Sequence, residues 1–460
     1  MPTVSKKADT AIKNGVLVTS RELKRADIYI KDGLVDSIES PDHDRSASKV
    51  IDASEKLILP GIIDAHLHPV YADRIDTLSK AAAVDGITTI IPYIGAVKAW
   101  GATGGLLDAI GDFIEEGERT SVIDFGIHGA LMQHDVDDAS ATIPKSVARG
   151  IVSFKVFMAY KKRGMKLEDD DILKIMNLAA ANNALLAAHA ENGAVIDFLE
   201  TAFIAEGKVS PEYHGRSHPG LCEAEAIFRL LMLGTVAACP VYIPHISAKE
   251  SLDVVRQFKR WGGLEFYTET CPHYLTLTEA DMSRWGSLAK MSPPLRGRDD
   301  VQALWQALHE GLIDVVGSDH AGHTTAANQP LQDRIFDAPN GIPGLDTVFK
   351  VVYEEGVNQG RITLSRLVEV MCEKPAKIFG LYPRKGTVAE GGDADIVLFD
   401  PAAATIIKAQ HPLLNVDYSV YEGRSCLGAP VMVMQRGRIL MEDGELKGTP
   451  GLGRFVSGTR

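Results

Sequence analysis

Short apolar runs alternate with helix-type stretches through the middle of the chain, and few folds accommodate that alternation. The stretches 170–182 and 223–233, for example, are rich in Ala and Leu and carry apolar residues at helical spacing. Strands that alternate with helices are typical of a parallel sheet, and eight such units predict a closed (β/α)8 TIM barrel. The eight candidate strands are Leu57–Ile63, Thr88–Pro92, Val122–Ile127, Val152–Phe157, Leu185–Ala188, Val241–Pro244, Leu264–Thr268 and Ile313–Val316.

Both ends of the chain have a different sequence pattern, which predicts short strands and tight turns. Near the N-terminus, Lys31-Asp32-Gly33 is a hairpin signal that follows the strand-like run 27–30. Near the C-terminus, the runs 394–399 and 431–440 are similar. We therefore expect residues 1–57 and 386–460 to form one accessory β-sandwich domain, and residues 58–385 to form the TIM barrel that carries the chemistry.

Length and charge limit the class of partner. A chain of 460 residues suits a barrel of roughly 250 to 400 residues with a smaller companion. The formal net charge of -13 disfavours binding to nucleic acid or to an anionic membrane, since both require basic surfaces. A small molecule is the expected ligand.

The cysteines and the N-terminus indicate the compartment. Five cysteines, without a C-x-x-C pair, do not suit a disulfide framework. Residues 1–18 contain scattered charges and no apolar run of signal-peptide length, and the sequence has no uncharged apolar stretch long enough to span a membrane. These features predict a cytoplasmic protein.

Unusual polar residues follow the predicted strands at their carboxyl ends, where the loops of a barrel converge on one face. A single buried histidine is more often a core residue, an isolated lysine can reach solvent, and a lone aspartate can cap a helix. Together, however, nitrogen and oxygen ligands at five strand ends favour a site for zinc-type ions. The six residues are His66, His68, Lys155, His189, His245 and Asp319.

The order H-x-H, Lys, His, His, Asp resembles that of the amidohydrolase superfamily. The sequence around these residues resembles its dihydropyrimidinase and hydantoinase branch, whose members hydrolyse cyclic amides. The resemblance covers nearly the whole chain. The similar stretches are 60–68 (PGIIDAHLH), 153–160 (SFKVFMAY), 188–193 (AHAENG), 244–248 (PHISA), 269–275 (ETCPHYL), 290–296 (KMSPPLR), 317–320 (GSDH), 340–344 (NGIPG) and 386–395 (GTVAEGGDAD).

The resemblance implies two divalent metal ions, taken to be Zn²⁺, and a division of labour among the ligands. His66, His68 and Asp319 would hold one ion and His189 and His245 the other, with Lys155, carbamylated by CO2, as the bridge. Carbamylation also answers a physical problem, because it replaces a buried ammonium by an anionic ligand compensated by two cations.

The same resemblance assigns roles in catalysis. A hydroxide between the two metals would attack the ring amide, and Asp319 would act first as general base and then as general acid. The phenol of Tyr160 would stabilise the oxyanion, and Ser292 and Asn340 would present backbone groups to the ring.

Several alternatives stay open. The expected substrate is a dihydropyrimidine or a 5-substituted hydantoin. The sequence 319–324 (DHAGHT), however, is more similar to the corresponding sequence of allantoinases and dihydroorotases. Against dihydroorotase, the chain reads Pro69-Val70-Tyr71 after His68, without the early arginine that grips a ring carboxylate. Two other classes are a non-catalytic dihydropyrimidinase-related protein and a carbohydrate- or nucleotide-binding barrel with accidental histidines. By analogy with the family, we expect a homo-oligomer, a tetramer.

Overall fold

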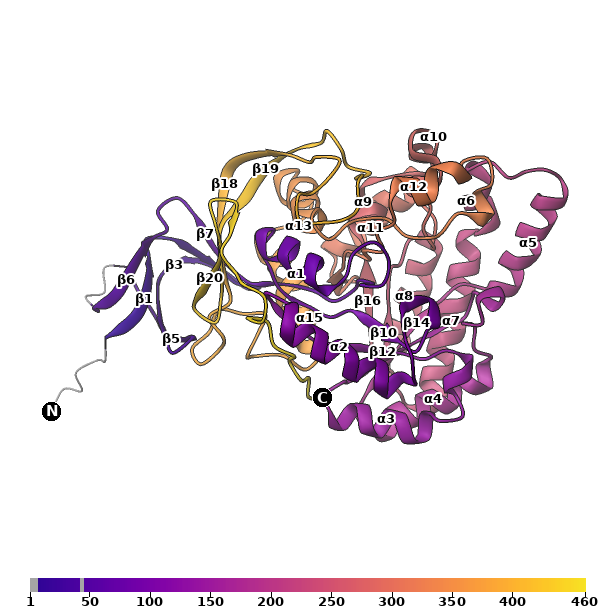
Figure 1. Ribbon diagram of the computed structural model, residues 1–460, viewed down its shortest axis with the longest axis horizontal. Helices are drawn as coiled ribbons and strands as arrows, with labels where there is room; N and C mark the ends of the chain where they lie inside the picture. The colour runs from indigo at the N-terminus through magenta and orange to yellow at the C-terminus, as the bar shows by residue number, and fades with distance from the viewer. Residues whose placement is uncertain (1–6, 42–44) are drawn as a thin grey trace.

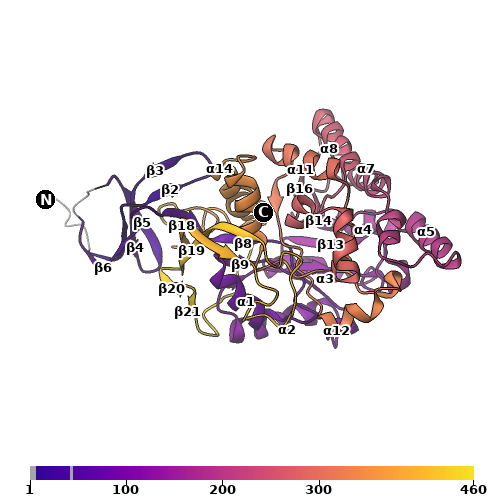
Figure 2. The same ribbon diagram turned by 90° about the horizontal axis from the view of Figure 1, so that it is seen from above.

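The computed structural model has a mixed α/β fold with strand-rich and helix-rich ends (Figure 1). It describes residues 7–41 and 45–460. Residues 1–6, which belong to the segment expected to lack a signal peptide, and residues 42–44 lie outside the described residues. Seen from above, the N-terminal strands lie at one end and the helices α4, α5, α7 and α8 at the other (Figure 2).

Parallel strands form the centre of the helix-rich part. One sheet has the order β10-β12-β13-β14-β15-β16-β17, and a second has the order β11-β9-β8. All eight predicted runs contain or overlap one of these strands, so the alternating pattern was correctly interpreted. The bounds are β8 Ile62–Asp64, β9 Ile87–Ile90, β10 Tyr93–Gly95, β11 Asp124–Phe125, β12 His128–Ala130, β13 Ser153–Phe157, β14 Leu185–His189, β15 Val241–Ile243, β16 Phe266–Thr270 and β17 Val315–Val316.

Two strands, β10 and β12, were not predicted. Each continues an earlier strand after a short break, at Ile91-Pro92 after β9 and at Gly126-Ile127 after β11. Proline has no N–H to give to a sheet ladder, so a break at Pro92 is expected. One chain segment therefore contributes β9 to one sheet and β10 to the other, and a second segment contributes β11 and β12 in the same way. At the far edges, the backbone N–H of His68 donates to the carbonyl of His320 at 2.8 Å.

Helices surround the parallel strands (Figures 1 and 2). The predicted helix 170–182 is confirmed as α4 except for Asn182, which follows the end of that helix, and the predicted helix 223–233 is confirmed as part of α7. In α4, the buried residues Ile172, Ile175, Met176 and Ala179 recur at helical spacing and face the core. The bounds are α1 Ile75–Val84, α2 Leu106–Thr120, α3 Ala139–Ala148, α4 Asp169–Ala181, α5 Gly193–Ala205, α6 Glu212–Ser217, α7 Gly220–Ala237, α8 Lys249–Trp261, α9 Pro272–Thr276, α10 Met282–Trp285, α11 Arg298–His309, α12 Thr325–Asn328, α13 Val348–Val352, α14 Leu364–Val368 and α15 Lys374–Ile378.

The two ends of the chain meet in one sheet of order β21-β20-β19-β18-β7-β2-β3, and further N-terminal strands form a sheet of order β5-β4-β1-β6. The predicted hairpin is present between β4 and β5, with positive φ at Asp32 (52°) and Gly33 (83°). The run 431–440 is not one strand, because it turns at Arg436-Gly437. The bounds are β1 Ala8–Lys13, β2 Val16–Val18, β3 Leu23–Arg25, β4 Asp27–Lys31, β5 Leu34–Glu39, β6 Ala47–Asp52, β7 Leu57–Pro60, β18 Ile396–Ile406, β19 Ser425–Gln435, β20 Arg438–Glu442 and β21 Glu445–Leu446.

The predicted strand Leu57–Ile63 needs a correction. Its first half, β7, pairs with β18 and β2 in the terminal sheet, and its second half belongs to β8 and pairs with β9. Only Gly61 separates the two halves. A Cβ atom at Gly61 would lie 2.0 Å from Thr88 Oγ1, so the close packing here admits no side chain. One apolar run therefore serves two sheets.

A buried ion cluster joins the terminal sheet to the parallel strands. Lys385 Nζ lies 2.7 Å from Asp124 Oδ2 on β11, 2.7 Å from Asp395 Oδ2 and 3.1 Å from Asp393 Oδ2. Arg436 also pairs with Asp124. Burial opposes the charged lysine, but the three carboxylates outweigh burial and raise the pKa of Lys385.

Replacing Lys385 by methionine is expected to lower the free energy of unfolding by about 3–5 kcal/mol, because it leaves buried carboxylates uncompensated. The matched control is Lys377→Met, which removes a partly exposed i,i+4 pair with Glu373 and should cost roughly 0.5 kcal/mol or less. Chemical denaturation of the wild type and the two variants measures both losses in the free energy of unfolding. Equal, small losses in the two variants would contradict a structural role for the cluster.

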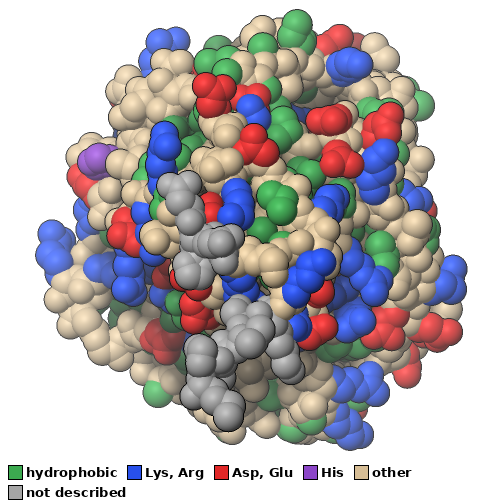
Figure 3. All heavy atoms as spheres, turned by 90° about the vertical axis from the view of Figure 1, so that its left-hand side faces the viewer, with side chains coloured by type: hydrophobic (Ala, Val, Ile, Leu, Met, Phe, Trp, Pro, Cys, Tyr) green, Lys and Arg blue, Asp and Glu red, His purple; other side chains and the backbone are tan. Residues whose placement is uncertain are grey.

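The surface carries charges of both signs. On the face at the strand-rich end, Lys and Arg side chains are interspersed with Asp and Glu (Figure 3). Such a mixed surface lacks the concentrated positive field that phosphate backbones select. Within the described residues, no helix has the length and apolar character needed to cross a membrane.

Candidate active site

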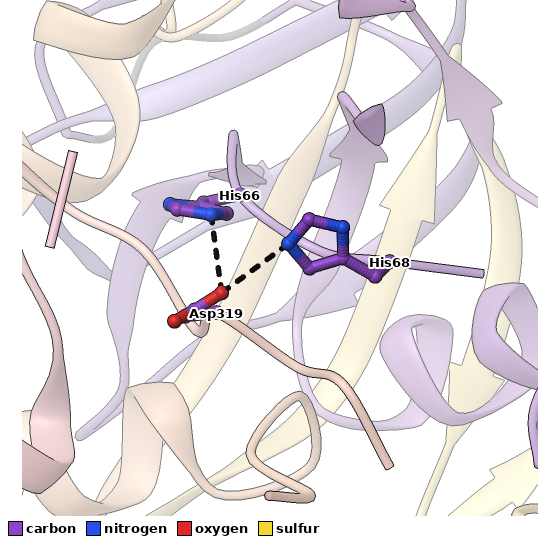
Figure 4. A group of neighbouring side chains, drawn as sticks. All are labelled: His66, His68 and Asp319. Carbon is purple, nitrogen blue, oxygen red and sulfur yellow. Dashed lines mark ion pairs between the residues drawn. The ribbon is translucent and has the colours of Figure 1, made fainter. Parts of the chain in front are cut away.

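The first group of predicted site residues lies at the carboxyl ends of β8 and β17. Asp319 Oδ1 lies 3.1 Å from His66 Nε2 and 3.5 Å from His68 Nε2 (Figure 4). The i, i+2 spacing of the two histidines in an extended segment turns both rings to the same side. Each of the three residues offers one ligand atom, and these atoms lie within 4.8 Å of one another.

Lys155 reaches the same point from β13. Its Nζ lies 3.3 Å from His66 Nε2 and 4.1 Å from the centre of the Tyr93 ring, and the residue is only 2% exposed. Among the described residues, no carboxylate lies within ion-pair distance of Nζ. Burial lowers the pKa of Lys155 to about 8, although Asp319 and Glu269 oppose this shift.

The last two histidines face each other from the ends of β14 and β15. His189 Nδ1 lies 3.2 Å from His245 Nε2, and both residues are buried. The ring of His245 also lies 5.3 Å from that of His66, centre to centre. All six predicted ligands therefore surround one small volume.

Three residues that face this volume have a left-handed backbone. The φ angles are 67° for Tyr160, 44° for His245 and 47° for Asp319. This region is costly for residues with a Cβ and is often found at functional sites, where the surrounding structure enforces it. In each case the bend falls within a few residues of the end of a strand.

Two buried glutamates hold the histidine rings, and sequence reasoning assigned neither a role. Glu269 Oε1 lies 2.5 Å from His66 Nδ1 and accepts from the backbone N–H of His245 at 3.1 Å. Glu191 Oε2 lies 2.8 Å from His189 Nε2. A carboxylate partner selects the ring tautomer and leaves the other nitrogen free to bind a cation. The signal for Glu269 was its position, directly after the predicted strand Leu264–Thr268.

The charge state of the site follows from these contacts. For His66, burial opposes the charged form, but Glu269 and Asp319 prevail and raise the pKa to about 9. For Asp319, burial is outweighed by His66 and His68, which hold the pKa of the carboxyl well below its usual range. Burial lowers the pKa of His68 to about 4. Near neutral pH the Asp319 carboxylate is therefore ionised and the His68 ring is neutral, whereas His66 carries a proton that a bound cation would displace.

The three remaining predicted residues line the same cavity, of about 70 Å³. Tyr160, Ser292 and Asn340 form part of its wall together with His68, Lys155, His189, His245 and Asp319. The ring of Tyr160 lies 4.7 Å from that of His189, centre to centre. Burial raises the pKa of the Tyr160 phenol, so the phenol keeps its proton and remains a hydrogen-bond donor.

The donor set fits divalent metal ions. Imidazole nitrogens and a carboxylate oxygen converge on one point, and the facing ring nitrogens of His189 and His245 must share one hydrogen or bind a cation. His68 Nδ1 is buried and has no hydrogen-bond partner among the described residues. The described residues contain two further groups of potential metal ligands. Cys271 and His273 lie beside the candidate site, since they form a group with Asp319. Asp124, Asp393 and Asp395 form the other group, but the ammonium of Lys385 already compensates their charge.

The fold and this site together define a hydrolase-type centre on a parallel α/β scaffold, and the comparisons with known proteins agree. Residues 57–440 match the model of the amidohydrolase family. The chain belongs to this family, in its hydantoinase branch.

Curated relatives match over nearly their full length. A D-hydantoinase of Ralstonia pickettii is 38% identical over 97% of this chain and 98% of its own, and an L-hydantoinase of Paenarthrobacter aurescens is 35% identical over 98% of both. A crystal structure of a D-hydantoinase has a TM-score of 0.92 at 34% identity, covering 98% of this chain and 99% of its own. The dihydropyrimidinase from Brevibacillus agri has a TM-score of 0.91 at 33% identity, with the same coverage.

Proposed function

We propose that the enzyme hydrolyses the ring amide of a 5-substituted hydantoin or a dihydropyrimidine with the help of two divalent metal ions. One observation carries the proposal: six potential ligands from five strand ends surround one buried volume, beside a cavity that is open to a small molecule. Relatives named D-hydantoinase, L-hydantoinase and dihydropyrimidinase support the substrate class. Because both D- and L-selective relatives have similar identity, identity alone selects neither enantiomer.

We assign the metal ligands as the sequence suggested. His66, His68 and Asp319 would hold one ion, and His189 and His245 the other. Lys155, as a carbamate formed with CO2, would join the two. A buried amine without a carboxylate partner supports the carbamate, since an unpaired ammonium would be costly to bury. When bound, a pair of zinc-type ions makes hydroxide available near neutral pH and polarises a carbonyl.

The protein's own groups move the protons and hold the ring. Asp319, whose low pKa keeps it ionised, accepts a proton during attack and returns it to the ring nitrogen that leaves. Tyr160 donates its phenolic hydrogen to the carbonyl oxygen as negative charge develops there. Ser292 and Asn340, which line the same cavity, present backbone groups to the polar edge of the ring. Exclusion of water by the narrow cavity strengthens each of these contacts.

We also propose the finer architecture. Residues 58–385 form a closed (β/α)8 TIM barrel, supported by the hydrogen bond from His68 to His320 between its first and last segments. Residues 1–57 and 386–460 form a β-sandwich, to which β7 adds a strand. The two terminal sheets share one apolar core that includes Ile12, Ile28, Ile396 and Met434, which supports a sandwich.

A substrate panel tests the proposed function. The purified, metal-loaded enzyme is incubated with dihydrouracil, hydantoin, allantoin and dihydroorotate, and ring opening is followed by ultraviolet absorbance. We expect hydrolysis of the first two at rates well above that of dihydroorotate, whose ring carboxylate has no arginine after His68. Preferred turnover of allantoin would favour the allantoinase alternative, and protein that binds no metal and opens no ring would refute the proposal.

The cellular setting is part of the proposal. A cytoplasmic location is supported by five buried cysteines that form no disulfide. A homotetramer is supported by large apolar side chains exposed on neighbouring helices, such as Phe198 on α5 and Leu221 and Val236 on α7, each about 70% exposed. Light scattering of the purified enzyme measures the oligomeric state.

A further inference from the structure

A second and larger cavity, of about 690 Å³, adjoins the candidate active site. It lies directly beside the inner cavity, because five residues line both. The shared wall residues are Tyr71, Trp100, Arg163, Met165 and Asn340. A substituent on a ring held beside Asp319 would therefore point toward the residues that the two cavities share.

Part of the wall of the outer cavity is apolar. Val97, Trp100, Met132 and Met165 contribute to its walls, and Trp100 lies on the short 3-10 helix Lys98–Trp100. Such a wall suits the hydrocarbon part of a substituent.

The charge of the outer cavity has one sign. Arg163 and Lys98 line it, together with His134 and His323, and no Asp or Glu does so among the described residues. This is unexpected in a chain with a net charge of -13. Neither Arg163 nor Lys98 forms an ion pair within the described part of the chain. Two cations without a carboxylate partner among the described residues therefore face a cavity beside the reaction centre.

The position of Arg163 connects this charge to the site. It ends the 3-10 helix Lys161–Arg163, which begins directly after Tyr160, and its guanidinium carbon lies 5.4 Å from the centre of the Tyr160 ring. Arg163 contributes to both cavities, and so stands where a substituent leaves the ring-binding space. A guanidinium can grip a carboxylate with two parallel hydrogen bonds.

We propose that the preferred substrates carry a ring substituent that ends in a carboxylate, and that Arg163, assisted by Lys98, determines this specificity. The inference rests on the proposed function for the identity of the ring. The apolar wall receives the stem of the substituent, and the two cations bind its anionic end. The products are then N-carbamoyl derivatives of acidic amino acids.

Kinetics on matched substrates test the inference. Hydantoins with a 5-carboxyalkyl chain of increasing length are compared with their carboxamide isosteres, which have the same shape and no charge. We expect the wild-type enzyme to favour the best carboxylate by on the order of tenfold in kcat/KM, the equivalent of about 1.4 kcal/mol. In Arg163→Gln the ratio of the two kcat/KM values, carboxylate over carboxamide, should fall to about one, and this ratio is the readout because it is independent of any change in the absolute rate.

Lys161→Gln is the matched control. Lys161 lies in the same 3-10 helix and is exposed, but it does not line either cavity. The Lys161→Gln substitution removes the same charge as Arg163→Gln, so a general field effect would lower the preference for the carboxylate in both variants. Lys98→Gln should lower the preference by a smaller factor. Equal kcat/KM for carboxylate and carboxamide in the wild type, or an unchanged preference in Arg163→Gln, would overturn the inference.

A binding measurement separates this inference from the proposed function. Calorimetric titration of the same ligands into the metal-loaded Asp319→Asn variant reports affinity without turnover. If the wild type opens no hydantoin or dihydropyrimidine ring, the proposed function fails. The inference still stands in that case if carboxylates bind about tenfold tighter than carboxamides and Arg163→Gln removes the difference, and it falls if they do not.

Discussion

Replacing Lys155 by alanine is expected to remove both bound metal and turnover. The side chain is buried beside His66 and lines the same cavity as His189 and His245. Without it, repulsion between two dications is no longer compensated by a bridging anion. We expect metal content, measured by elemental analysis, to fall from two ions to one or none, and kcat/KM to fall by about 10³-fold or more.

Three comparisons sharpen this test. Short carboxylic acids such as acetate should partly restore both metal and activity in Lys155→Ala, because they place a carboxylate in the vacated space. Lys155→Arg keeps a cation but cannot form a carbamate, and so should stay inactive. Lys290→Ala removes another buried lysine, whose Nζ donates to the carbonyl of Ala338 at 2.6 Å, and should retain both ions. Two ions and full turnover in Lys155→Ala would rule out the bridging role.

Replacing Asp319 by asparagine is expected to preserve the fold and abolish most of the catalysis. The amide keeps the shape of the side chain but can neither take up a proton nor return it to the leaving nitrogen. We expect kcat to fall by on the order of 10²- to 10⁴-fold, the usual contribution of a general acid–base group. Circular dichroism should be unchanged, and weaker metal binding should be overcome by added zinc.

The control for Asp319 is Asp417→Asn. Asp417 also accepts two hydrogen bonds, from the backbone N–H and the hydroxyl of Thr325 at 2.7 and 2.6 Å, but it does not line the active-site cavity. Its substitution should leave kcat within about twofold of wild type, as expected for a surface change. Near-normal kcat in metal-saturated Asp319→Asn would exclude Asp319 from proton transfer.

The sequence was sufficient to predict the elements of the fold, because buried parallel strands appear as apolar runs whatever their partners. It was not sufficient to predict where strands break. β10 and β12 are short continuations that carry no separate apolar run, and Leu57–Ile63 looks like one strand although Gly61 divides it between two sheets. Pairing partners depend on the three-dimensional arrangement, which periodicity does not encode.

The same distinction holds for the site. His66, Lys155 and Asp319 could be proposed as ligands because their side-chain types are rare at the end of an apolar strand. The role of Glu269 depends on a contact with His66 across 203 positions of sequence. That of Arg163 depends on the absence of an acidic neighbour in the cavity wall. Contacts between distant segments, and gaps between them, become visible only in the folded chain.

The division of residues 57–64 between two sheets has a consequence for how the ligands are supported. No loop intervenes between β7, held by β18 from the far end of the chain, and the two histidines that follow β8. If β18 separated from β7, His66 would be displaced as well, because only a few residues of extended backbone connect β7 to His66. We therefore expect the helix-rich half alone to hold these histidines poorly, and any metal affinity of the site to depend on strands from the last part of the chain to be synthesised.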